Sequence, residues 1–271
     1  MRERRLRTSM RAAAVPASLA ATASAFATLA LLEPRVARAD GPSFDRPGIA
    51  FAPTTMPQGS FTWEQGLVDY SRDVYRGVTS TGWSFDTRLR YGFTDRLEVQ
   101  LEVPMWAGAR TQGGGTRTSG DGFGDLGLAA KFDLFPGDGD WDLALLGVVL
   151  FPTGDAAVSL DDEQYSLGAT LGTSFGEGQS LAFYANVDRF RGDYTWTLSS
   201  SWGFDLAESL AGYVEAGYVP AGNGDPSNVL AGGGLMWAVK DTVQLDAWVL
   251  AGVNEPSPDL EVGVGVSFFF P

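Results

Sequence analysis

The chain has 271 residues, of which 44% are hydrophobic and 12% aromatic, and it contains neither Cys nor His. The lack of both residue types excludes disulfide bonds, thiolate zinc sites, cysteine nucleophiles and catalysis through imidazole. With 19 Lys+Arg against 33 Asp+Glu, the formal net charge of −14 argues against a nucleic-acid partner, because such partners need a basic surface. We therefore expect no enzymatic activity and no cofactor.

The N-terminus has the layout of a secretory signal peptide. Five arginines lie within residues 1–11, an Ala/Leu-rich stretch runs from Ala12 to about Leu32, and Ala37-Arg38-Ala39 supplies small residues for cleavage. The alternative is a membrane anchor, but the stretch is rich in Ala, Ser and Thr and therefore weakly apolar for a permanent span. We predict a signal peptide over 1–39, a periplasmic segment over 40–59 and a β-barrel over 60–271.

Strict alternation of apolar and polar residues begins within residues 83–93. There Trp83, Phe85, Leu89, Tyr91 and Phe93 take one face, and polar, charged or Gly residues take the other. A period of two indicates a β-strand with one face in an apolar medium and one in a polar medium, whereas a helix would show a period of 3.6.

The same alternation recurs to the end of the chain. In residues 97–105 the odd positions are Leu, Val or Met, and the even positions begin with Glu98, Gln100 and Glu102. About twelve such runs are present, at residues 60–71, 82–93, 97–106, 123–135, 141–152, 164–175, 180–190, 193–204, 209–220, 228–239, 243–252 and 259–270. Each is about as long as a tilted strand that crosses a bilayer.

The polar faces of these runs are too hydrophilic for a packed protein core, so the chain combines a wet interior with an apolar exterior. This predicts an all-β fold: a transmembrane, antiparallel, up-and-down β-barrel of about twelve strands with both termini periplasmic. The connections after even-numbered runs are short, as at 94–96, 136–140, 176–179 and 240–242. Those after odd-numbered runs are mostly longer, notably 107–122, 153–163 and 221–227.

Four segments resemble a known family. They are residues 47–68 (PGIAFAPTTMPQGSFTWEQGLV), 122–128 (GFGDLGL), 152–154 (PTG) and 263–268 (GVGVSF). They are similar to the outer-membrane transporters grouped as the "putative MetA pathway of phenol degradation". The resemblance implies a porin-like barrel of a Gram-negative outer membrane that passes small, hydrophobic or aromatic molecules. One departure is the final Pro271, since such barrels end on an aromatic residue. We therefore expect Phe270 to be the assembly signal read by the barrel-assembly machinery.

Charged residues on the polar faces are the candidate functional residues of the lumen. If residues 94–96 form the turn and Phe93 faces Leu97, then Arg90 pairs with Gln100 and Arg88 with Glu102. The predicted lumen-lining residues are Asp86, Arg88, Arg90, Glu98, Glu102, Asp125, Lys131, Glu215 and Asp246. Further inward acids are predicted at Asp133, Asp142 and Glu261. The excess of acids predicts a weak cation preference, and the alternative is that these charges only hydrate the lumen.

No metal site is predicted. Residues 121–125 and 222–225 offer oxygen ligands on Gly turns, but neither has the spacing of a calcium loop. The leading functional prediction is a passive channel or transporter whose partners are outer-membrane lipid and small-molecule solutes. The alternatives are a structural or adhesive barrel that binds partners through acidic loops, an outer-membrane hydrolase, which the missing His disfavours, and a soluble periplasmic β-protein.

Overall fold

The computed structural model describes residues 43–135 and 140–271, so the predicted signal peptide and most of the predicted turn at 136–140 lie outside the described residues. The strands in this part of the chain are β1 (Phe61–Tyr75), β2 (Val78–Thr94), β3 (Leu97–Gly113), β4 (Thr116–Gly122), β5 (Leu126–Asp133), β6 (Asp142–Phe151), β7 (Gln164–Phe175), β8 (Gln179–Phe190), β9 (Asp193–Ala207), β10 (Leu210–Val219), β11 (Asn228–Lys240), β12 (Val243–Gly252) and β13 (Leu260–Phe270). Within the described residues there is no helix long and apolar enough to cross a membrane.

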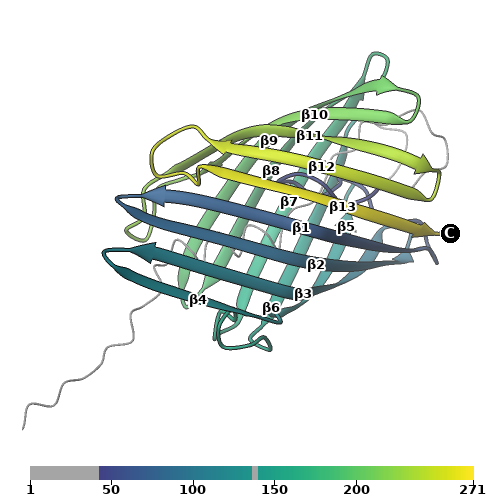
Figure 1. Cartoon of the computed structure of the whole chain (residues 1–271). Coiled ribbons are helices and arrows are strands. Elements are labelled where there is room, and N and C mark those ends of the chain that lie inside the picture. Colours follow the sequence, from purple (N-terminus) through teal and green to yellow (C-terminus); the bar gives the residue numbers. More distant parts are fainter. Residues whose placement is uncertain (1–42, 136–139) are drawn as a thin grey trace, which may run out of the picture.

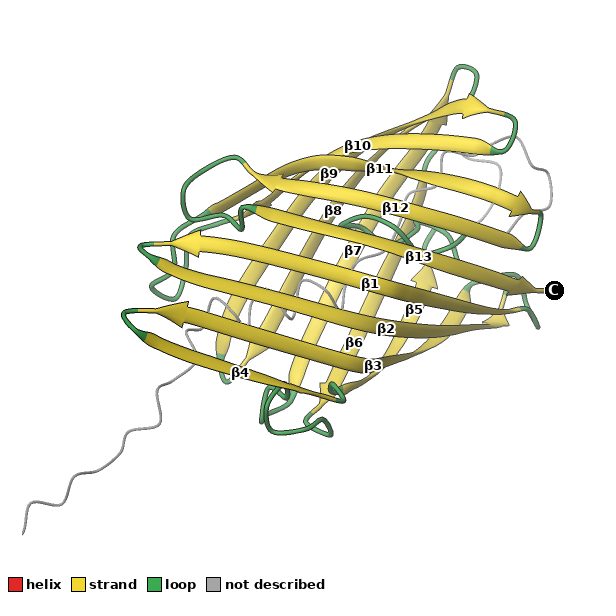
Figure 2. Cartoon of the chain, viewed as in Figure 1, coloured by secondary structure: helices red, strands yellow, loops and turns green. Residues whose placement is uncertain are grey.

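The strands form one antiparallel sheet that closes on itself. Apart from β4 and β5, consecutive strands pair along the sheet. β1 pairs with both β2 and β13, which joins the two ends (Figure 1, Figure 2). The thirteen strands occupy twelve positions in the wall because β4 and β5 both pair with β3. The predicted twelve-stranded barrel is therefore confirmed.

One predicted loop is wrong, and it lies at the wall position that β4 and β5 share. Residues 107–122 were expected as a long connection, but β3 continues to Gly113 and pairs with β4 as an extended hairpin. Between β4 and β5 the chain leaves the ladder opposite Pro104, whose carbonyl accepts a hydrogen bond from the Gly124 N–H at 3.0 Å. A proline has no N–H for a ladder, which explains why the pairing is interrupted there. The other two long connections, 153–163 and 221–227, lie between strands as predicted.

Two of the hairpins that have two-residue turns share the turn sequence Arg-Gly. Arg76-Gly77 joins β1 to β2, and Arg191-Gly192 joins β8 to β9. All four residues have positive φ, with 50° and 79° in the first turn and 49° and 93° in the second. This is the pairing of angles that suits the twist of a tight β-hairpin, and glycine adopts it without steric cost.

The alternation seen in the sequence becomes an inner and an outer face. In β3, the side chains of Glu98, Gln100 and Glu102 are buried, whereas Val99 and Met105 are exposed on the outside. Large apolar side chains are exposed in the same way around the other strands, as lipid contact requires. The last strand follows the pattern to Phe270, whose ring lies 5.8 Å from the ring of Phe61 on β1.

Candidate functional site in the barrel lumen

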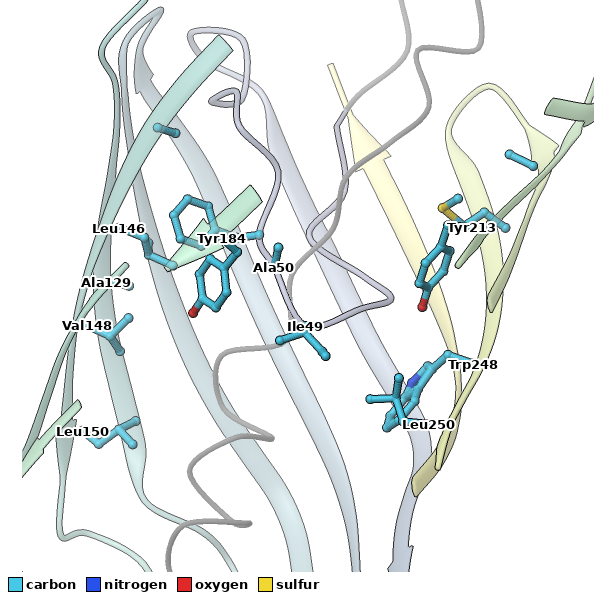
Figure 3. Packing of buried hydrophobic residues seen from close by; sticks show 14 residues of the cluster. Ile49, Ala50, Ala129, Leu146, Val148, Leu150, Tyr184, Tyr213, Trp248 and Leu250 are labelled. Carbon is cyan, nitrogen blue, oxygen red and sulfur yellow. The ribbon is translucent and has the colours of Figure 1, made fainter. Parts of the chain in front are cut away.

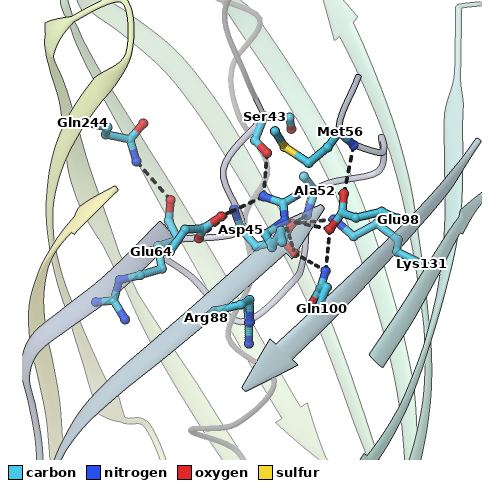
Figure 4. Close-up of polar contacts among 12 residues, drawn as sticks. Ser43, Asp45, Ala52, Met56, Glu64, Arg88, Glu98, Gln100, Lys131 and Gln244 are labelled. Atoms are coloured by element: carbon cyan, nitrogen blue, oxygen red, sulfur yellow. Dashed lines mark hydrogen bonds and ion pairs between the residues drawn. The ribbon is translucent and has the colours of Figure 1, made fainter. Parts of the chain in front are cut away.

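Residues 43–60, here called the lumen segment, lie inside the barrel. Phe51, Ala52 and Met56 are fully buried, and the segment forms hydrogen bonds with inward-facing side chains of β1, β3, β10 and β12 (Figure 3, Figure 4). Residues 40–59 were predicted as a periplasmic N-terminal segment that precedes the β-barrel of residues 60–271. In the structure, residues 43–56 are packed in the interior of the barrel because their backbone and charged side chains have partners on the wall, whereas residues 57–59 are exposed.

A network of five buried charges holds one side of the lumen segment. The Arg90 guanidinium lies 2.7 Å from Glu64, 2.7 Å from Glu98 and 3.4 Å from Asp45. The Lys131 ammonium lies 2.6 Å from Asp45 and 3.8 Å from Glu98 (Figure 4). All five side chains have zero exposure. Buried charges are tolerated only with well-formed ion pairs and hydrogen bonds, so each member depends on the others.

Asp45 is the member of this network contributed by the lumen segment. Its burial raises the pKa of its carboxyl group, but the charges of Arg90 and Lys131 lower that pKa by more, so the net pKa lies below its ordinary value. The carboxylate also accepts hydrogen bonds from the Ala52 N–H and from the side-chain amide of Gln100. Asp45 is therefore ionised at neutral pH and ties the segment to β2, β3 and β5.

Arg46 forms a second attachment, to the opposite side of the network. Its guanidinium lies 3.3 Å from Asp69 on β1 and 3.4 Å from Asp246 on β12. Burial alone would lower the pKa of the Arg46 guanidinium, but the charges of Asp246 and Asp69 raise it by more. The net pKa lies above its ordinary value, so the guanidinium stays charged. A Cβ on Gly265 would stand 2.5 Å from the Arg46 Nε, which shows that glycine is needed where the guanidinium crosses β13.

Wall carboxylates also accept hydrogen bonds from the backbone of the lumen segment. Glu64 accepts from the Asp45 N–H at 3.0 Å, Glu98 from the Met56 N–H at 2.8 Å, and Glu215 from the Ile49 N–H at 2.9 Å. These bonds replace the pairing that a strand would provide, because buried backbone N–H groups need partners. A segment without regular secondary structure can thus be buried in the lumen.

An apolar contact fixes the tip of the lumen segment. The Phe51 ring meets the Tyr184 ring of β8 edge to face, with 5.7 Å between centroids and 87° between planes. A Cβ on Gly168 would lie 2.9 Å from the Phe51 ring, so the glycine admits it. Burial of a phenylalanine side chain stabilises by about 1.5–3 kcal/mol.

The inner face of β6 differs from the polar wall that was expected. After Asp142, its inward side chains, shown in part on one side of Figure 3, are apolar and buried: Ala144, Leu146, Val148 and Leu150. Together with Phe51 and Tyr184 they belong to one apolar cluster. The lumen therefore has an apolar side, which the sequence indicates only in that residues 143–151 are apolar on both faces.

The predicted cross-strand pairs are present in the register of β2 and β3. Arg90 is opposite Gln100 and Arg88 is opposite Glu102, and the Arg88–Glu102 ion pair measures 3.0 Å. Leu97 is opposite Thr94, not Phe93 as expected, because an irregularity between Gly92 and Thr94 absorbs one residue. The side chain of Arg90 bonds the carboxylates around it rather than Gln100.

The remaining predicted residues lie on the inner face but have different partners. Asp86 accepts a hydrogen bond from the Ser84 hydroxyl at 2.6 Å. Asp125 accepts from the N–H groups of Gly154 and Leu160, both at 2.8 Å, and so anchors the connection between β6 and β7. Asp125 is therefore a loop anchor rather than a free lumen charge.

Four residues of the lumen site are absent from the predicted lumen-lining set. Asp45 and Arg46 lie in the predicted periplasmic segment, and Tyr213 and Trp248 are buried aromatics of the inner face. The position of Trp248 in the polar face of its strand, between Asp246 and Leu250, was the available signal. Among the described residues, no group of three Asp or Glu is arranged to hold a metal ion.

Comparison with known proteins agrees with this architecture. An outer membrane channel from Pseudomonas putida F1 is similar in structure, with a TM-score of 0.67 and 15% identity over 80% of this chain and 97% of that one. The β-domain of the Bordetella autotransporter BrkA gives a TM-score of 0.57 at 14% identity, over 79% of this chain and 100% of that one. The KdgM porin gives 0.52 at 10% identity, over 78% and 99%.

No curated protein matches the sequence. Residues 44–270 match the family described as "Putative MetA-pathway of phenol degradation". This range includes the lumen segment from Phe44 onward and the whole of β13. The matched range thus begins with the residues that fill the lumen and ends where the barrel closes. The chain belongs to this family.

Proposed function

We propose that the protein is an outer-membrane channel for the passive passage of small solutes, with a bore narrowed by the lumen segment. The observation that carries this proposal is the charged inner wall of a twelve-stranded barrel closed around residues 43–60. Barrels of eight strands are filled by their own side chains, whereas those of sixteen leave an aqueous channel. Twelve strands give an intermediate bore, which a single extended segment can restrict.

The solutes of this channel are small, and hydrophobic or aromatic molecules are among them. Two observations support this class: the description of the family refers to phenol degradation, and the inner face of β6 is apolar. At the long-loop end, an open pocket of about 670 Å³ lies between Tyr75 at the end of β1, Arg76 in the β1–β2 turn and the connection between β10 and β11. A cavity of this size fits a small molecule.

The charged side chains of the lumen set which solutes pass. Arg88, Arg90 and Lys131 are outnumbered by inward acids that include Glu98, Glu102, Glu215 and Asp246, so the field in the lumen favours cations. If the charges only hydrate the lumen, their removal will leave selectivity unchanged. No catalytic role is proposed, because the chain has no His or Cys and its paired charges are used for attachment.

The channel is tested by recording the purified protein in planar lipid bilayers. We expect discrete conductance steps for the wild type and larger steps for Arg90→Ala, in which the lumen segment is loosened. Folding is checked in parallel by the mobility shift of unheated barrels in gels. A correctly folded wild type and a correctly folded Arg90→Ala that both fail to conduct would reject the channel and favour the structural or adhesive barrel.

We also propose that residues 1–39 direct export to the outer membrane of a Gram-negative bacterium, and that Phe270 is the signal for barrel assembly. Phe270 ends β13 on the outer face, next to the closing strand β1. Deletion of Phe270-Pro271 should abolish surface protein, whereas deletion of Pro271 alone should not. Normal surface levels of the double deletion would reject this role.

A further inference from the structure

Two rows of inward-facing residues on β10–β13 form a surface that is only partly in contact with the lumen segment. Residues of one row are opposite one another across the four strands, and residues of the second row lie one step nearer the long loops. The first row is Tyr213, Gly234, Trp248 and Gly263, and the second is Glu215, Gly232, Leu250 and Glu261.

The glycines of the first row let two aromatic rings lie against the wall. A Cβ on Gly234 would stand 2.6 Å from the Cε1 atom of Tyr213, and a Cβ on Gly263 would stand 2.4 Å from the Nε1 atom of Trp248. Both rings therefore cover the backbone of the neighbouring strand (Figure 3). The arrangement turns aromatic surface toward the lumen, where water-filled barrels usually present polar groups.

Polar atoms on these side chains have no protein partner among the described residues. Tyr213 and Trp248 are each only 4% exposed, yet the hydroxyl of Tyr213 and the Nε1–H of Trp248 form no hydrogen bond in the described part of the chain. Glu215 uses one oxygen for the Ile49 N–H, and its Oε1 atom has no partner there. Buried polar groups normally form hydrogen bonds with protein groups or with ordered water, so groups without a protein partner are available to water or to a ligand.

The charge of this surface is also uncompensated. Glu261 is 4% exposed and makes no hydrogen bond or ion pair with any described residue, and it lies in the same row of inward residues as Glu215. The guanidinium of Arg46, which approaches the neighbouring row, is shared between Asp69 and Asp246. A pair of buried carboxylates without a cation is strongly unfavourable, so the surface favours a positively charged guest.

We propose that Tyr213, Glu215, Trp248 and Glu261 form a binding site for an organic ammonium ion, a primary amine on a small aromatic or apolar body. Carboxylates accept charge-assisted hydrogen bonds from an ammonium group, and aromatic faces attract cations and cover the apolar body. A metal ion such as calcium would need more oxygen ligands than this surface offers. The inference rests on the proposed channel, because it names a solute class for the lumen.

The test is isothermal titration calorimetry of the purified full-length mature protein in detergent with three probes of equal size. Benzylammonium should bind, benzyl alcohol should bind at least tenfold more weakly, and benzoate should not bind. Glu261→Gln and Trp248→Leu should each weaken benzylammonium binding about tenfold, since each removes one recognition element. Asp188→Asn, which changes an inward acid on β8 far from the site, serves as the matched control and should bind as the wild type does.

Several results would overturn the proposal. Equal binding of benzylammonium and benzyl alcohol would show that the surface recognises only the apolar body. Competition by potassium at the same concentrations would show that it recognises only the positive charge. Unchanged binding in Glu261→Gln or Trp248→Leu, with folding verified by gel mobility, would place the ligand elsewhere. Conductance is recorded in parallel without any amine: a conducting wild type that binds no benzylammonium rejects this site alone, and a binding wild type that does not conduct rejects the channel alone.

Discussion

Acids on the β1–β3 side of the lumen have cations beside them, whereas Glu215 and Glu261 on the β10–β13 side have none among the described residues. On the first side, Arg90 and Lys131 bind both the wall and Asp45, so the charges serve to hold the lumen segment. On the second side, the carboxylates lie beside aromatic rings. Acidic residues thus hold the lumen segment in the first region, whereas in the second region they are available to bind a solute.

The largest effect is expected from Arg90→Ala, which removes the centre of the paired region. Asp45 and Glu98 would then keep only Lys131 as a cation, and Glu64 would lose its ion pair. Removal of one partner of a buried ion pair costs about 3–5 kcal/mol. The lumen segment should leave its binding place, which should raise single-channel conductance and expose residues 43–60 to proteinase K. Unchanged conductance and protection would mean that the network does not hold the segment.

A smaller effect is expected from Lys131→Met. It removes the ammonium 2.6 Å from Asp45 but leaves Arg90 in place. A hydrogen bond to a charged group contributes about 1.5–3 kcal/mol, so the segment should loosen without full release. Proteinase K digestion at several temperatures would measure the difference, and digestion as fast as in Arg90→Ala would contradict the ranking.

Lowering the pH provides an independent test of the contact between Asp45 and Lys131. The pKa of Asp45 lies below its ordinary value of 3.8 in the docked segment, so its stabilisation is complete above that value and is lost as the pH falls through the lower one. The contribution of Asp45 to holding the lumen segment should therefore be constant above about pH 5 and should be lost only in stronger acid, where conductance should rise as the segment loosens. In Lys131→Met the remaining decrease of the pKa is smaller, and the rise should begin at a higher pH.

On the unpaired side, Glu215→Gln combined with Glu261→Gln should change selectivity rather than the position of the segment. A unit charge about 7 Å from a passing ion contributes roughly 0.6 kcal/mol in water, so each lost carboxylate should lower cation preference about threefold. Reversal potentials in a salt gradient measure this preference. A shift equally large in Asp188→Asn would show that the effect is not local to β10–β13.

The smallest effect is expected from Arg72→Ala. Arg72 pairs with Asp259 at 3.7 Å, and both side chains are nearly half exposed. Exposed pairs contribute about 0–1 kcal/mol, so conductance and thermal stability should stay within error of the wild type. A loss comparable to that of Arg90→Ala would mean that burial does not determine which pairs matter.

The barrel wall could be predicted because period two is a local property. Each strand shows in its own sequence which side chains face lipid, and a short turn between β2 and β3 was enough to place Arg88 opposite Glu102. The β3–β4 hairpin was missed because residues 107–122 are rich in Gly and Thr and show no apolar alternation. Strands that project beyond the bilayer lose the pattern on which the prediction depends.

By itself, the sequence determined the all-β class, the number of wall positions and the faces of the strands, because an apolar exterior and a wet interior constrain every second residue. Only the tertiary structure decided that residues 43–60 enter the lumen and that Arg90 bonds Glu64, Glu98 and Asp45 instead of Gln100. These contacts join residues far apart in the chain, such as Arg46 and Asp246, 200 positions away. No local pattern records such a pairing, since it forms only when the barrel closes and brings β1 beside β13.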